Sequence, residues 1–186
     1  YATAQPSNEL NNIAPNCKKI IMVAGFRYQK DQDTLIRATA LLPQEFHTFL
    51  VGDGERREVC ENLAIAEGVS NRVHFMGIRM DVPELLKAAD YIVMSSHWEG
   101  LSLASIEGMS VGKPFLASDV DGLREITTNV GVLFQHQNAT QLAEEIKVLD
   151  KNTAKYQQIA QQCFDKAKLF DISIMEEKYN NVYLNA

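Results

Sequence analysis

Short apolar runs alternate with segments of helical spacing along most of this chain, and that alternation constrains its fold more than any other feature. The apolar runs are short enough to be strands, and they lie at 19–24, 47–51, 72–76, 91–95, 114–117 and 131–134. Helical patterns lie at 33–42, 55–67, 82–89, 102–111, 123–128, 138–149, 153–169 and 172–184. Strands that alternate with helices form a parallel sheet covered on both faces. The sequence therefore predicts a Rossmann-like three-layer α/β sandwich with about six parallel strands.

Several residues mark where the predicted helices begin and end. Gly68 follows the second helix and suits a C-cap, and Pro83 lies near the start of the third. Asp53 is predicted to cap the helix that follows it. Asn138 with Gln141 three residues later predicts a capping box at 138–149.

The chain has the length of one ordinary domain, 186 residues. Residues 1–18 are polar and contain Pro6, Pro15 and several Asn, so we expect a linker or a trimmed edge there. Residues 19–186 are predicted to form the domain itself. The first residue is Tyr1 rather than Met, which suggests a piece of a longer protein.

Charge and cysteine content exclude several classes of function. The net charge is −6 without a block of Lys or Arg, which argues against nucleic acid as the main partner but allows a small phosphorylated ligand. Three widely spaced cysteines favour neither a disulfide framework nor a zinc site, and they fit a reducing compartment. The four histidines show no ligand spacing, so no metal is predicted. A dinucleotide-dependent dehydrogenase is disfavoured because no GxGxxG follows the first strand.

The loop after the 91–95 strand carries the strongest functional signal. Ligands of such sheets bind beyond the carboxyl ends of the strands. Here Glu99 and Glu107 are separated by seven residues and bracket the start of a helix. The free backbone amides at that start, aided by the helix dipole, form an anion site. The pattern suits a ligand that runs sugar, diphosphate, ribose.

The segment 99–126, EGLSLASIEGMSVGKPFLASDVDGLREI, resembles the E-x7-E signature of retaining glycosyltransferases of the GT-B fold, family 4. It includes a Gly-x-Pro before a strand, Ser-Asp after it, and a Gly-x-x-Glu that ends at Glu125. Upstream, segments 23–31, 51–55 and 73–77 resemble further family motifs in the expected order. The resemblance covers about residues 19–184 and identifies the chain as the C-terminal, donor-binding domain.

The resemblance implies a role for each matching position. Glu99 would bind donor-sugar hydroxyls, and Glu107 would bind the ribose. The diphosphate would be held by Lys30 and by the amides of Gly100, Leu101, Ser102 and Leu103, while Gly77 and Ile78 would flank the nucleobase. The family usually has an Arg where this chain has Gly25. Either Arg27 would replace it from the same loop, or diphosphate binding would rest on Lys30 and the helix terminus. No catalytic residue is assigned within the chain.

The implied reaction transfers a sugar from a nucleotide diphosphate to an acceptor hydroxyl with retention, without a metal or other cofactor. The acceptor, a glycan or glycolipid, would bind an N-terminal domain absent from this chain. We therefore expect the chain to bind a nucleotide sugar but to have little activity alone. We also expect the protein to be cytoplasmic, with peripheral association at the inner membrane face through the missing domain. The alternatives are a GT-B epimerase or phosphorylase and a non-catalytic nucleotide-binding module.

Overall fold

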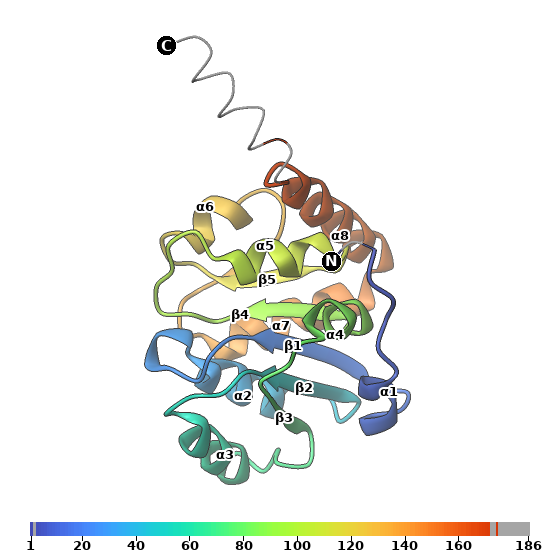
Figure 1. Ribbon diagram of the computed structural model, residues 1–186. Helices are drawn as coiled ribbons and strands as arrows, with labels where there is room; N and C mark the ends of the chain where they lie inside the picture. Colours follow the sequence, from blue (N-terminus) through green and yellow to red (C-terminus); the bar gives the residue numbers. More distant parts are fainter. Residues whose placement is uncertain (2, 172–173, 175–186) are drawn as a thin grey trace.

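The computed structural model describes residues 1, 3–171 and 174 and contains one six-stranded parallel sheet (Figure 1). Its strands are β1 (Lys18–Val23), β2 (Phe46–Val51), β3 (Val73–Gly77), β4 (Tyr91–Met94), β5 (Phe115–Ser118) and β6 (Val132–Phe134). Their order across the sheet is β3-β2-β1-β4-β5-β6, and each neighbouring pair is parallel. The predicted Rossmann-like architecture with six strands is confirmed.

Helices cover both faces of this sheet. They are α1 (Glu9–Ile13), α2 (Gln32–Leu41), α3 (Arg57–Ala66), α4 (Val82–Ala88), α5 (Leu103–Ser110), α6 (Leu123–Thr127), α7 (Ala139–Lys151) and α8 (Thr153–Lys168). On one face α2 packs against α3 and α7, whereas α4 and α5 lie in front of the sheet in Figure 1. Helix α8 contacts both α5 and α7. In the described part of the chain, no helix has the length and apolar character needed to span a membrane.

The central strands are apolar because both of their faces are covered. All four residues of β4 and all four of β5 are buried. Such strands carry no alternation of polar and apolar residues, which explains why they appear in the sequence as continuous apolar runs. Phe115, Phe49 and Phe26 are fully buried among them and help to fill the core.

The amino-terminal segment is more ordered than a linker. Within residues 1–18 the structure has the short helix α1, whose Leu10 is fully buried. Arg79 donates to both carboxylate oxygens of Glu9, at 2.7 and 2.6 Å, and so ties α1 to the segment before α4. Five residues are too few for a stable isolated helix, so tertiary contacts hold α1. The helix predicted at 172–184 lies outside the described residues except for residue 174.

Two predicted caps differ in the structure. Helix α3 begins at Arg57, so Asp53 lies too far upstream to cap it, and its Oδ1 accepts the Gly54 N–H instead. At α7 the Asn138 side chain accepts the Gln141 N–H at 2.9 Å, as predicted. The other half of the capping box is wrong, because the Gln141 side chain accepts the N–H of Gln135 rather than that of Asn138.

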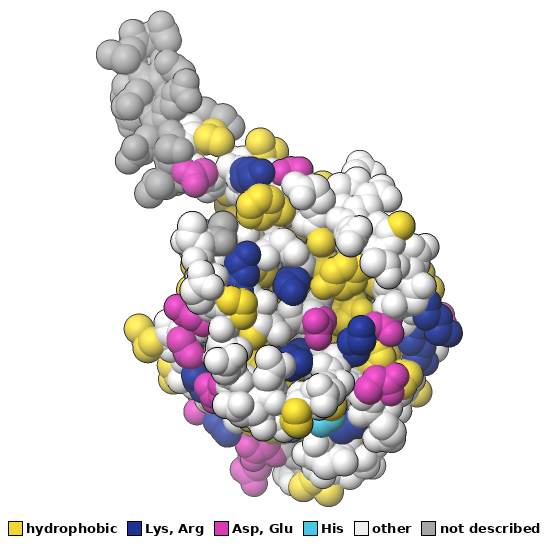
Figure 2. Space-filling view, turned by 90° about the vertical axis from the view of Figure 1, so that its right-hand side faces the viewer, with side chains coloured by type: hydrophobic (Ala, Val, Ile, Leu, Met, Phe, Trp, Pro, Cys, Tyr) yellow, Lys and Arg dark blue, Asp and Glu magenta, His cyan; other side chains and the backbone are white. Residues whose placement is uncertain are grey.

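The strand order places a topological switch point between β1 and β4. From β1 the chain continues to β2, and from β4 it continues to β5, so the two connections leave in opposite directions. Parallel sheets bind ligands at such a switch point, outside the carboxyl ends of the strands. The other end of the sheet, where the strands begin, faces the viewer in Figure 2, and basic and acidic side chains are interspersed on it.

Candidate functional site

The loop after β1 is shaped by its contact with the loop after β2. A Cβ on Gly52 would lie 2.2 Å from the Ala24 carbonyl oxygen, and one on Gly54 would lie 2.5 Å from that of Phe26. Both glycines have positive φ, so a side chain is excluded by space and by conformation. This contact supports the turn that carries Lys30, the last residue of a 3₁₀ helix (Tyr28–Lys30).

Lys30, in the loop after β1, contacts the loop after β4. Its Nζ lies 2.5 Å from Glu99 Oε1, and the Glu99 side chain is only 6 % exposed. The Ser96 hydroxyl donates to the same oxygen at 2.7 Å, and the buried Ser118 hydroxyl donates to the Ser96 carbonyl. The Glu99 side chain is therefore held in one orientation by a cation and a hydroxyl.

The amino end of α5 opens beside this carboxylate. Ser102 is the N-cap residue, but in the described part of the chain its hydroxyl makes no capping hydrogen bond. Leu101 and Leu103 are 63 % and 70 % exposed, and a Cβ on Gly100 would meet nothing within 4 Å. The first amides of α5 thus have no capping side chain from Ser102, and the helix dipole favours an anion at this end.

Helix α5 packs closely on the sheet through a glycine. A Cβ on Gly108 would lie 2.8 Å from Ile92 Cγ2 of β4. Because real Cβ contacts are longer, only a residue without a side chain fits between this helix and the strand. Gly108 therefore lets α5 rest directly on β4 and sets the position of its amino end.

Glu107 lies in the second turn of α5 in different surroundings from Glu99. It lines a cavity of about 570 Å³ together with Tyr1, Thr3 and side chains of α8. Burial, followed by a hydrogen bond to Glu107 and its charge, raises the pKa of the Tyr1 phenol to about 12. Glu107 is thus an acceptor facing this cavity, whereas Glu99 faces Lys30.

The remaining predicted site residues lie along the same edge of the sheet. Arg27 is exposed, and its Nε lies 4.0 Å from the position that a Cβ on Gly25 would occupy. Gly77 ends β3 with φ 68°, and its carbonyl accepts the Gly52 N–H at 2.8 Å. Ile78 is 78 % exposed just beyond. Gly77 is two strands away from β1, so Gly77 and Ile78 lie farther along the edge than Lys30.

Sequence reasoning missed the polar contacts that connect the two loops. Gln29 accepts the His97 N–H at 2.7 Å through its carbonyl and donates to the Trp98 carbonyl through its side chain at 2.9 Å. Ser96 orients Glu99 through its hydroxyl, a role that no sequence motif marks. Single polar residues in loops carry no periodic signal, so only the fold reveals these contacts.

A second polar cluster lies at the same edge of the sheet. Asp31, His97 and His136 have ligand atoms within 4.8 Å of one another, and the described residues contain no other such group of three. Burial raises the pKa of the Asp31 carboxyl, with hydrogen bonds from Thr34 acting against it. The wide separation of the two histidines in the sequence hid this arrangement.

Similarity in sequence and similarity in structure point to the same group of proteins. The family described as glycosyl transferases group 1 matches residues 6–165. The chain is 26 % identical to the N,N'-diacetylbacillosaminyl-diphospho-undecaprenol alpha-1,3-N-acetylgalactosaminyltransferase of Campylobacter jejuni, over 88 % of this chain and 44 % of that protein. It is 38 % identical to the lipopolysaccharide core biosynthesis glycosyltransferase LpsE of Rhizobium meliloti, over 55 % of this chain and 30 % of that protein.

Similar solved structures include Anabaena Alr3699/HepE in complex with UDP and in complex with UDP-glucose. The TM-scores are 0.89 and 0.87, with 25 % and 27 % sequence identity. In both cases the match covers 96 % of this chain and 51 % of the other. The chain thus spans from about a third to about half of the length of these relatives.

Proposed function

The chain belongs to the glycosyl transferases group 1 family, and on that premise we propose that it is the donor-binding half of a retaining, family 4 glycosyltransferase. It would bind a nucleotide diphosphate sugar, with a uridine nucleotide as the first choice. This choice is supported by the similarity to Anabaena Alr3699/HepE, whose complexes with UDP and with UDP-glucose match this chain with TM-scores of 0.89 and 0.87. The observation that carries the proposal is the contact of Lys30 with Glu99, which stands four residues before the uncapped amino end of α5 at Leu103.

In this proposal the diphosphate lies at the start of α5. The amides of Gly100, Leu101, Ser102 and Leu103 would donate to its oxygens, and Lys30 would neutralise part of its charge. As the bond between the sugar and the diphosphate breaks, negative charge grows on the leaving group. Preorganised amides and a cation stabilise that charge without reorganisation.

Arg27 is proposed to supply the second cation. The family's Arg would start from the Gly25 position, and the Arg27 Nε lies 4.0 Å from a Cβ built there. A side chain two residues later thus reaches the same region of space. With two cations and a helix terminus available, we propose that donor binding needs no metal or other cofactor.

The two glutamates and the end of β3 would fix the rest of the donor. Glu99, held by Lys30 and Ser96, would accept hydrogen bonds from sugar hydroxyls through its free lone pairs. Glu107 would accept those of the ribose. Gly77 and Ile78 would flank the base, where the exposed Ile78 offers an apolar surface.

The acceptor side would lie in an N-terminal domain outside this chain. The acceptor hydroxyl would attack the anomeric carbon on the face that the diphosphate leaves, and closure of the two domains would exclude water. The activity of the Campylobacter relative on a diphospho-undecaprenol acceptor supports a glycolipid or glycan acceptor here. We accordingly propose a cytoplasmic protein that meets the inner membrane face through the missing domain and that is inactive as the isolated chain.

Isothermal titration calorimetry of this chain with UDP, GDP and ADP at millimolar concentration tests the donor proposal. The expected result is weak binding of one nucleotide, preferentially UDP. Failure of all three to bind would overturn it. Arg27→Ala with unchanged affinity would reject the role of Arg27 alone. A full-length protein with its acceptor, analysed for product stereochemistry, tests retention.

A further inference from the structure

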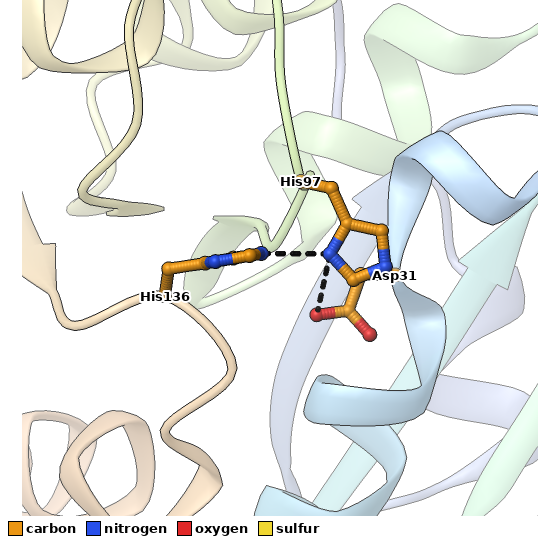
Figure 3. A group of neighbouring side chains, drawn as sticks. All are labelled: Asp31, His97 and His136. Carbon is orange, nitrogen blue, oxygen red and sulfur yellow. Dashed lines mark hydrogen bonds and ion pairs between the residues drawn. The ribbon is translucent and has the colours of Figure 1, made fainter.

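The four histidines of the chain form two contact pairs. His47 Nδ1 lies 2.9 Å from His74 Nε2, and His97 Nδ1 lies 2.7 Å from His136 Nε2. The second pair differs because a carboxylate joins it: Asp31 Oδ2 lies 3.7 Å from His97 Nδ1. Figure 3 shows that the same His97 ring nitrogen faces both His136 and Asp31.

Three separate loops supply this group. Asp31 is the N-cap of α2 after β1, His97 follows β4, and His136 follows β6. The ligand atoms all lie within 4.8 Å of one another. Zinc binds imidazole nitrogen and carboxylate oxygen at about 2.0–2.2 Å, which places tetrahedral ligand atoms roughly 3.3 Å apart. The histidine nitrogens would separate slightly and the carboxylate would approach, both by small side-chain rotations.

We propose that Asp31, His97 and His136 form a binding site for a divalent transition metal, with zinc the best match to the ligands. Two imidazoles and one carboxylate supply three ligands, and water would complete a tetrahedron. In the present hydrogen bond the two nitrogens share one hydrogen. With a metal bound, both would direct lone pairs toward the ion and carry their hydrogens on the other ring nitrogens.

The surroundings orient two of the three ligands. The Thr34 hydroxyl donates to Asp31 Oδ2 at 2.6 Å, and the Thr34 N–H donates to Oδ1. Tyr28 packs on the His97 ring with 4.5 Å between centroids, and the His97 backbone N–H is bonded to Gln29. Outer contacts of this kind fix the orientation of metal ligands.

A path to the site and a suitable charge are also present. Asp31 and His97 line a cavity of about 320 Å³ that also contains Arg37 and Arg56. Both arginines are paired, with Glu67 and Asp33 respectively, so their charges are partly balanced. The buried Asp31 carboxylate supplies the negative charge that a cation needs.

A metal here would tie together the loops that carry Lys30 and Glu99. Lys30 immediately precedes Asp31, and Glu99 follows His97 by two residues. The ion would connect both loops to the β6–α7 connection and hold them rigidly. This role is structural, and it rests on the three side chains rather than on the proposed donor function.

Titration of the full 186-residue chain with zinc alone, against a chromophoric chelator, tests the site. The wild-type chain should bind one zinc ion. His136→Ala should lower the zinc affinity at least about tenfold, because even the loss of a residue that only contacts a metal ligand costs about tenfold or more. His47→Gln is the matched control, because it removes a histidine from the pair that lacks a carboxylate, and it should leave the affinity unchanged. Cys17→Ser should also leave it unchanged.

Cobalt provides a second readout of the same site. Wild-type chain should give the visible absorption of four-coordinate cobalt, and His136→Ala and His97→Gln should lose it. Equal zinc affinity in the wild type and His136→Ala, or an equal loss in His47→Gln, would overturn the proposal. Circular dichroism verifies folding of each variant. UDP titration of metal-free protein separates failure of this site from failure of the donor proposal.

Discussion

The backbone of Gly122 lies against the backbone of Glu99, so closely that a Cβ on Gly122 would be 2.2 Å from the Glu99 carbonyl oxygen. It would also lie 2.5 Å from the Gly100 carbonyl oxygen. The turn before α6 therefore buttresses the loop that presents Glu99 and the start of α5. A residue outside the proposed contacts with the donor thus determines the shape of that loop.

Replacement of this glycine should damage both stability and donor binding. Gly122→Ala must relieve a clash with backbone atoms and adopt φ 80°, so we expect a loss of at least about 2 kcal/mol in the free energy of unfolding. Gly112→Ala is the matched control: its φ is 70°, but a Cβ there meets nothing within 4 Å. Strain in φ alone should cost it about 1 kcal/mol. Urea unfolding and UDP titration of both variants provide the measurement, and equal effects would contradict the buttress.

Removal of the Lys30 charge should weaken nucleotide binding. Hydrogen bonds to charged groups contribute about 1.5–3 kcal/mol, so Lys30→Ala should lower UDP affinity about 10- to 100-fold. Lys18→Ala is the control, because Lys18 pairs with Asp150 at the opposite edge of the sheet, 2.9 Å away. Calorimetry that found the two variants alike would remove Lys30 from the site.

Removal of the Glu107 carboxylate should affect nucleoside recognition more than diphosphate recognition. Glu107→Ala should reduce UDP affinity about tenfold or more by removing acceptors for the ribose. Binding of inorganic pyrophosphate should change little. Glu144→Ala, an exposed position on α7, serves as the control. A parallel loss of pyrophosphate binding would argue that Glu107 acts on the helix rather than on the ribose.

The His47–His74 pair should make stability depend on pH. Burial, with a smaller effect of the neighbouring His47, lowers the pKa of His74 from 6.5 to about 4. Between these values the unfolded chain binds a proton that the folded chain does not, so stability should fall as pH decreases from about 6.5 toward 4. The loss should be at most about 3 kcal/mol, and less for the partly exposed ring.

His74→Gln removes the titrating group while retaining hydrogen-bonding capacity beside His47. Its free energy of unfolding should therefore vary less than that of the wild type between pH 7 and pH 5. Urea unfolding at several pH values measures this difference. Identical pH dependence in the two proteins would show that His74 titrates normally.

Most of the fold could be predicted because buried parallel strands and amphipathic helices leave strong local patterns. The run predicted at 19–24 is observed at Lys18–Val23, and the helix predicted at 102–111 at Leu103–Ser110. Helix α1 left no such pattern, since its stability depends on the burial of Leu10 and on the distant Arg79. The Gln141 side chain likewise accepts the Gln135 N–H rather than the predicted Asn138 N–H because of the path of the loop between β6 and α7.

The candidate site was predictable where it rests on motifs and not where it rests on packing. Resemblance placed Lys30 and Glu99 in one site, and the structure brings them into contact. The support from Ser96 and Gly122 arises between loops that are distant in sequence. The approach of His136 to His97 has the same origin, because loops after parallel strands meet at one edge whatever their order in the chain.

The close packing of α5 on β4 at Gly108 offers a way to adjust the position of the α5 amino end in steps. Alanine, then serine, at this position would lift the helix outward by increasing amounts, and its amino end would move with it. The distance from that end to the β1 loop would grow accordingly, so under the proposed function a short series at one buried position would shift preference toward bulkier sugars.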